Sequence, residues 1–236
     1  ATPKRLDGLS KVFEWYLGNI VYSIKKRDDN NVNVKMIMYE NSDPEYCEEV
    51  LNFKLNPNSP KMINNICYFL PRTKKILEHL TDCLKEGRKI LMLSDRREHL
   101  KIIHSLIPEI EDGKYTSGFY LGGMKEKDLQ ETETKDVILG TFSMASEGFD
   151  CKYPLDTIFL TSPKSNIEQA VGRILRETPG KMHDPYVIDV VDNIAPMMNQ
   201  YRKRSQFYKK SGFSFEDKPV EIEELTKLHS YSFVED

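Results

Sequence analysis

Apolar strands that alternate with amphipathic helices over residues 71–212 constrain the fold more than any other feature of the sequence. The predicted helix at 71–87 carries a one-sided apolar stripe and is closed by Gly87. Strand-length apolar runs follow at 89–94, 118–123, 136–141, 157–162 and 185–191. Because apolar strands separated by helices are typical of a parallel sheet covered on both faces, we predict an α/β fold of that type.

The flanking parts of the chain are less regular. Residues 1–70 hold short apolar pieces at 12–24 and 32–40, which we expect to form β segments, and a short helix near 45–51. Residues after 212 are acidic. We therefore divide the chain into a connector or insertion at 1–70, a lobe at 71–212 and an acidic tail at 213–236.

The composition is that of an ordinary soluble protein. Charged residues make up 30% of the 236 residues and hydrophobic residues 39%, with a net charge of -3. No apolar run is long enough to span a bilayer and no signal-peptide pattern opens the sequence. We therefore expect an intracellular protein that makes no membrane contact.

The cysteines and histidines show no metal-ligand spacing. The four cysteines contain no C-x-x-C pair, so we expect reduced and mostly buried thiols instead of a metal site or disulfides. His99 and His104 are five positions apart, on different faces of a helix, and we expect both at the surface. The sequence thus predicts no metal site.

A basic run at 201–211 contains five Lys and Arg residues and no acid. Tyr201, Phe207 and Tyr208 interleave aromatic surface with this charge. A solvated helix face is the simpler interpretation, and a nucleic-acid contact is the alternative.

Residues that directly follow predicted strands are candidates for function, because the carboxyl ends of parallel strands gather at one edge of a sheet. After the first of these strands, Ser94 or Asp95 is placed to cap the next helix, with Arg96 and Arg97 in its first turn. Cations there oppose the helix dipole. The two arginines are therefore either a solvated pair or part of a binding site.

Two glycine-containing segments follow other strands. Thr141 ends a buried strand, and a run of small residues then leads to Gly148 and Asp150. Small side chains and a glycine let a backbone approach a phosphate closely, and a simple strand-to-loop turn has the same pattern. The Gly122–Gly123 pair is most typical of a tight turn.

A helix is predicted from Ser165, which forms an S-x-x-E capping box with Glu168. Its apolar stripe consists of Ile167, Ala170, Val171, Ile174 and Leu175. Another face carries Gln169, Gly172, Arg173 and Arg176 at the same helical spacing. Two guanidinium groups on one side can converge on a phosphate, and a pair of salt-bridged surface arginines is the alternative.

Three segments, in this order and spacing, resemble motifs IV, V and VI of the superfamily 2 helicases. They are SDRREHL at 94–100, GTFSMASEGFD at 140–150 and QAVGRILR at 169–176. The opening ATPKRLDGLSKVFEWYLG resembles the end of motif III and the sequence after it in a group that includes the poxvirus transcript-release helicase, African swine fever virus helicases and phage T4 UvsW. The resemblance covers roughly residues 1–25 and 85–210. It implies a second RecA-like lobe with an irregular N-terminal extension.

The resemblance also implies roles for matching residues. Arg173 and Arg176 match the motif VI arginines that stabilise charge on the γ-phosphate, and the other positions at the ATP cleft are Gln169, Gly148 and Asp150. Contacts to the nucleic-acid backbone fall on Thr141, Ser94, Arg96, Gly122 and Gly123. Motif VI here lacks the second glycine common in the superfamily, which disfavours RNA-helicase subfamilies that end in Gly-Arg-x-Gly-Arg.

The same resemblance implies an ATP-dependent DNA helicase that moves 3′ to 5′. ATP and Mg²⁺ would be held mainly by a first lobe, since no Gly-x-x-x-x-Gly-Lys-Ser/Thr loop occurs in these 236 residues, and we expect this chain alone to be inactive. Implied partners are that first lobe, single-stranded or duplex DNA and viral transcription machinery, in the host cytoplasm or the virion. The alternatives are an inactive RecA-like nucleic-acid-binding module and a duplex translocase that does not unwind.

Overall fold

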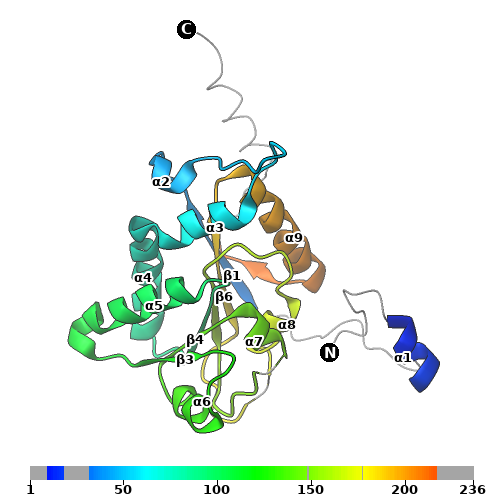
Figure 1. The fold of residues 1–236 in the computed structure, drawn as a ribbon. Helices are drawn as coiled ribbons and strands as arrows, with labels where there is room; N and C mark the ends of the chain where they lie inside the picture. The colour runs from blue at the N-terminus through cyan, green and yellow to red at the C-terminus, as the bar shows by residue number, and fades with distance from the viewer. Residues whose placement is uncertain (1–9, 19–31, 148, 177, 217–236) are drawn as a thin grey trace.

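The computed structural model describes residues 10–18, 32–147, 149–176 and 178–216 (Figure 1). Their strands form one seven-stranded sheet in the order β3-β4-β2-β5-β6-β1-β7, and every pairing is parallel. The strands are β1 (Asn33–Tyr39), β2 (Ile90–Leu93), β3 (Ser117–Tyr120), β4 (Val137–Gly140), β5 (Thr157–Leu160), β6 (Tyr186–Asp192) and β7 (Ser214–Phe215). The predicted parallel α/β fold is confirmed.

Helices cover both faces of this sheet. In the described residues they are α1 (Ser10–Leu17), α2 (Pro44–Cys47), α3 (Ser59–Tyr68), α4 (Leu70–Lys85), α5 (Arg97–Leu106), the 3-10 helix η1 (Ile107–Gly113), α6 (Glu126–Glu133), α7 (Phe142–Glu147), α8 (Glu168–Val171) and α9 (Ala195–Ser211). Side chains of α4 and α5 pack on one face, and those of α7, α8 and α9 pack on the other (Figure 1). None of these helices combines the length and apolarity needed to cross a bilayer.

The central strands are buried because both of their faces are covered. Every residue of β2, β4 and β5 is buried, and neighbours along a strand point to opposite faces, as Leu91 and Met92 do. The predicted helix that precedes β2 is α4, whose stripe includes Ile76 and Leu80. It ends before Gly87, which has a φ of +79°, a conformation that glycine adopts without steric cost.

The sheet extends into both flanking segments of the predicted division. β1 pairs with β6 along its whole length, and β7 pairs with β1. The sheet therefore includes parts of 1–70 and of 213–236. Pairing between segments so far apart in sequence leaves no local pattern from which the boundary could be predicted. Residues 217–236 of the tail lie outside the described ranges.

The local expectations for residues 1–70 are confirmed in part. The piece at 32–40 contains β1, and the short helix expected near 45–51 is α2. The β segment expected from residue 12 is wrong up to Leu17, where α1 lies. Val12, Trp15 and Tyr16 recur at i, i+3 and i+4, and so short an apolar run fits a helix as well as a strand. Residues 19–24 lie outside the described ranges.

Two buried ion pairs fasten helices to the central strand β6. Asp192 accepts two hydrogen bonds from Arg72 of α4, at 2.6 and 2.8 Å, and one from the Tyr46 hydroxyl. Asp189, three residues earlier and on the opposite face, accepts from Arg204 of α9 at 2.9 Å. Buried charges are tolerated when they are paired in this way. The two pairs fix α4 and α9 against the sheet that positions the site.

Candidate functional site

The predicted site residues fall into two groups that α7 connects. The first group follows β2, β3 and β4 at the carboxyl edge of the sheet and consists of Ser94, Arg96, Gly122, Gly123 and Thr141. The second group lies around α8 and the end of α7 and consists of Asp150, Gln169, Arg173 and Arg176. Gly148 lies outside the described residues. Thr141 directly precedes α7, and Arg173 contacts its last turn.

Ser94 is buried, and its hydroxyl makes polar contacts within the protein. Its hydroxyl lies 3.2 Å from Nδ1 of His99 and accepts a hydrogen bond from the Arg96 amide at 3.1 Å. The expectation of a surface His99 is wrong, because its ring is fully buried. Burial, and then the charge of Arg72, lowers the pKa of His99 to about 3, so the ring is neutral at pH 7.

The two arginines after Ser94 have different neighbours. Arg96 is the N-cap residue of α5 instead of lying in its first turn, and its guanidinium donates to Asn64 and to the carbonyl of Pro60 in α3. Arg97 begins the helix, is exposed and donates to the carbonyl of Gly122 at 3.3 Å. Gly123 completes the predicted turn with a φ of +90°. Neither Ser94 nor Asp95 caps α5 with a side-chain hydrogen bond.

Thr141 stands at the start of α7 and is half-buried. Its hydroxyl oxygen accepts from the Met144 amide at 3.4 Å and lies 3.3 Å from the Ser143 hydroxyl. Lys164, which sequence reasoning missed, reaches the same edge from the loop after β5, and its ammonium lies 2.8 Å from Asp95. The available signal was its position: like Ser94 and Thr141, it closely follows a buried strand.

The predicted helix around Arg173 is much shorter than expected. The capping box is wrong, because the N-cap residue of α8 is Ile167 and no side chain caps the helix. The helix ends at Val171 with Gly172 as its C-cap, and the amides of Arg173 and Ile174 bond three residues back, as in a tighter turn. The apolar stripe is confirmed, with Ile167, Ala170, Val171 and Ile174 buried and Leu175 partly buried.

Arg173 closes the end of α7. Its Nε donates to the carbonyl of Ala145 at 2.6 Å and its Nη2 to that of Ser146 at 2.8 Å. A guanidinium therefore takes up carbonyls that a helix end leaves unpaired, where positive charge is also favourable. Burial, and then the nearby Arg176, lowers the pKa of Arg173 from its ordinary value.

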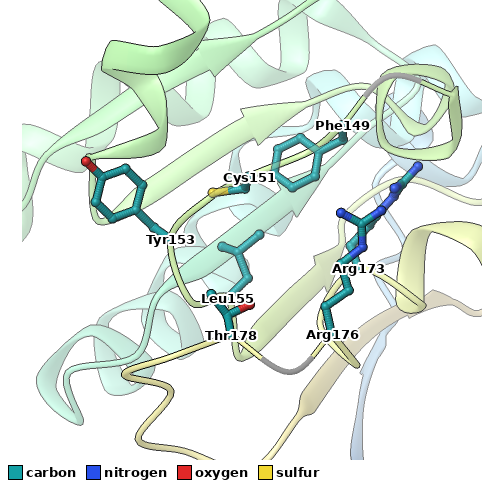
Figure 2. Close-up of a pocket in the computed structure, with 7 residues that line it drawn as sticks. All are labelled: Phe149, Cys151, Tyr153, Leu155, Arg173, Arg176 and Thr178. Carbon is teal, nitrogen blue, oxygen red and sulfur yellow. The ribbon is translucent and has the colours of Figure 1, made fainter.

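Arg176 is more exposed and pairs with Asp150. The side chains of these two residues are 44% and 87% exposed. Arg173 and Arg176 line one small, open pocket, and Figure 2 shows the side chains that line it. The other lining residues are Phe149, Cys151, Tyr153, Leu155 and Thr178. The structure thus brings both arginines and Asp150 together, while Gln169 lies on the exposed side of α8.

The aromatic residues of the basic run do not form a nucleic-acid surface. Tyr201 and Tyr208 are fully buried, and Phe207 packs partly buried against the core. The solvated face of the simpler interpretation holds for Arg202, Lys203, Lys209 and Lys210, whereas Arg204 is buried. No group of His, Cys, Asp or Glu in the described ranges is arranged to hold a metal ion.

The chain is similar in sequence to viral proteins whose names call them helicases. The chain is 34% identical over 215 residues to a mimivirus protein named "Putative ATP-dependent RNA helicase L396", a match that covers 90% of the chain and 41% of that protein. It is 24% identical over 236 residues to the African swine fever virus (Kenya isolate) protein "Putative ATP-dependent RNA helicase QP509L", covering 90% of the chain and 45% of the relative. The chain thus spans less than half the length of these relatives. No family model matches.

The fold is shared with a solved structure. The crystal structure of T4 UvsW superposes with a TM-score of 0.57 at 20% sequence identity, over 78% of this chain and 40% of the UvsW chain. At this identity the likeness establishes the fold alone.

Proposed function

We propose that this chain, a C-terminal RecA-like lobe of the superfamily 2 helicases, supplies arginine fingers and half of the nucleic-acid track of an ATP-dependent motor. The family rests on the homology to the mimivirus and African swine fever virus proteins and on the fold shared with UvsW. The activity of the whole motor is a proposal, because the chain spans only part of its relatives.

The pairing of Arg176 with Asp150 carries the proposal. Both side chains are largely exposed, and an exposed ion pair is worth about 0–1 kcal/mol. A phosphate can therefore displace the carboxylate, and a charge-assisted bond from guanidinium to phosphate is among the strong hydrogen bonds of proteins. Arg176 is the residue that would reach the γ-phosphate, and Asp150 would hold it beforehand.

Arg173 has a different part in this proposal. Two of its donors bind carbonyls of α7, so its guanidinium is a positioned positive charge beside Arg176. Through α7 it is also tied to Thr141, which faces the carboxyl edge of the sheet. A shift of Arg173 on nucleotide binding would therefore move the start of α7, where we propose that nucleic acid binds.

The described residues fit ATP in part and Mg²⁺ poorly. Two guanidinium groups at one pocket suit the phosphate charge, whereas no carboxylate cluster in the described ranges suits a metal ion. When bound, ATP supplies the phosphoryl group whose hydrolysis drives the motor. Contacts to Mg²⁺ and to most of the nucleotide are assigned to the first lobe, with Gln169 facing it.

The substrate class is the least determined part of the proposal. The wording of the sequence motifs favours DNA, whereas the printed names of both viral relatives favour RNA. Contacts from this lobe would go to the sugar-phosphate backbone, which both polymers share. The viral origin of the relatives supports a role in viral transcription or replication inside the infected cell.

ATP hydrolysis by the longer natural protein, with single-stranded DNA, with single-stranded RNA and with neither, tests the proposal. We expect stimulation by DNA. Stimulation by RNA alone would preserve the motor and change its substrate. Absence of hydrolysis under all three conditions would favour an inactive binding module, and stimulation without strand separation would favour a duplex translocase. Hydrolysis by the 236-residue chain itself would contradict the division of the active site between two lobes.

A further inference from the structure

The carboxyl edge of the sheet has a cation that no motif predicts. β4, β2 and β5 are neighbours in the sheet, and the loops that follow them carry Thr141, Asp95 and Lys164 respectively. The Lys164 ammonium lies 2.8 Å from Asp95 and 5.6 Å from the ring centroid of Phe142, the residue after Thr141. Lys164 therefore lies beside the segment proposed to bind the nucleic-acid backbone.

The protein holds the backbone of Lys164 in place from within its core. The carbonyl of Lys164 accepts a hydrogen bond of 2.7 Å from Arg204, whose side chain is only 2% exposed. Arg204 is itself fixed by Asp189 of β6. On the other side, Ser162 accepts from the Asp95 amide at 2.8 Å and ties the two loops together. These hydrogen bonds fix the backbone on both sides of the ion pair and so keep the Lys164 side chain at the carboxyl edge beside Asp95.

Two of the residues predicted to contact phosphate at this edge, Ser94 and Arg96, are engaged within the protein. Ser94 is buried against His99, and the guanidinium of Arg96 is directed to α3. By contrast, the side chains of Lys164 and Asp95 are 37% and 27% exposed. Their pair is accessible to solvent, and an accessible pair of this kind contributes little to stability. The Lys164 ammonium is thus accessible to a nucleic-acid backbone that lies along the carboxyl edge of the sheet.

We propose that Lys164 binds a phosphate of the nucleic-acid backbone at the carboxyl edge, and that Asp95 positions its ammonium until the phosphate replaces the carboxylate. This inference rests on the proposed function, since it assigns a further contact to the same track. A lysine presents a point charge without the directed fork of an arginine, so the contact is expected to show no base preference.

Salt-dependent binding of labelled oligothymidylate to the 236-residue chain, followed by fluorescence anisotropy, tests the assignment. Lys164→Gln should weaken binding about threefold to tenfold at low salt and reduce the slope of log affinity against log salt by about 0.7, the value for one contact to a single strand. Lys164→Arg should keep most of the affinity. Asp95→Asn should bind more tightly than the wild type and lose this gain in combination with Lys164→Gln.

Lys85→Gln is the matched control. Lys85 is also exposed and paired with an acid, Glu111 at 3.3 Å, but it ends α4 and so lies at the opposite, amino edge of the sheet. If Lys164→Gln and Lys85→Gln bind the oligonucleotide with equal affinity and equal salt slope, the assignment of Lys164 is wrong. The proposed motor function is not affected by that result. If the wild type does not bind oligothymidylate or a matching RNA at any salt concentration, the assignment of Lys164 fails, whereas ATP hydrolysis by the longer protein decides the motor separately.

Discussion

Two arginine–aspartate pairs of this molecule have the same chemistry and opposite settings. Arg72 and Asp192 are both fully buried and make two hydrogen bonds to each other, and Arg72 makes a third to the carbonyl of Thr161 at 2.9 Å. Arg176 and Asp150 meet at the surface. The difference indicates which pair can exchange partners: the buried pair is out of contact with water, whereas the surface pair is accessible to water and, in our proposal, to a phosphate.

Breaking the buried pair should give the largest loss of stability. Arg72→Leu leaves the Asp192 carboxylate without its counter-charge, and removal of one partner of a buried pair destabilises a protein by about 3–5 kcal/mol. Urea denaturation followed by circular dichroism measures the free energy of unfolding. Arg202→Leu on the exposed side of α9, where the arginine donates a hydrogen bond to Asn199, is the control and should change stability little. A loss below about 1 kcal/mol for Arg72→Leu would contradict the structural role of the pair.

The buried region should also respond to pH through His99. Its pKa is about 3 in the folded protein and about 6.5 when unfolded, so the unfolded chain binds a proton first as pH falls. The stability that comes from the neutral ring is therefore complete above pH 6.5 and is lost as pH falls from there toward 3. The expected slope is about 1.4 kcal/mol per pH unit below 6.5.

His99→Asn isolates this contribution, because asparagine keeps a polar group beside Ser94 and does not titrate. The difference in unfolding free energy between wild type and variant is measured from pH 7 to pH 5, so that the carboxylates cancel. It should shrink as pH falls. A difference that stays constant would mean that His99 is not neutral and buried in solution.

Elements with a local sequence pattern could be predicted, whereas contacts between distant segments could not. The strands around Leu91 and Ile158 and the stripe through Ile167 and Val171 are visible in the sequence, because burial and local periodicity leave a pattern in neighbouring residues. The place of β1 beside β6 leaves no such pattern. Burial of His99 is equally invisible, since Thr73 of α4, which lies beside its ring, is distant in the sequence.

The sequence proposes the residues of the candidate site, whereas their arrangement in space comes from the structure. Motif spacing singled out Arg173 and Arg176, and we expected one helix to carry both residues. That helix stops before them, with Gly172 as its C-cap, and the two arginines contact different partners. The capping box failed because the S-x-x-E pattern is short and common, while the buried Ile167 determined where the helix begins. Lys164 was missed because a single lysine after a strand has no motif of its own.

The smallest effect on stability should accompany the largest effect on function. Arg176→Ala removes an exposed pair and should change the free energy of unfolding by less than about 1 kcal/mol. In the longer natural protein the proposed role of Arg176 predicts that the same change lowers ATP hydrolysis by about a thousandfold or more, the effect typical of arginine fingers, while ATP binding persists.

The most direct test of the account is therefore ATP hydrolysis by the longer natural protein and its Arg176→Ala variant, each saturated with the stimulating nucleic acid, with Arg202→Ala as the control. We predict that the wild type and Arg202→Ala turn over ATP equally and that Arg176→Ala does not, although all three bind ATP and melt at similar temperatures. Normal turnover by Arg176→Ala would show that this arginine does not complete the active site.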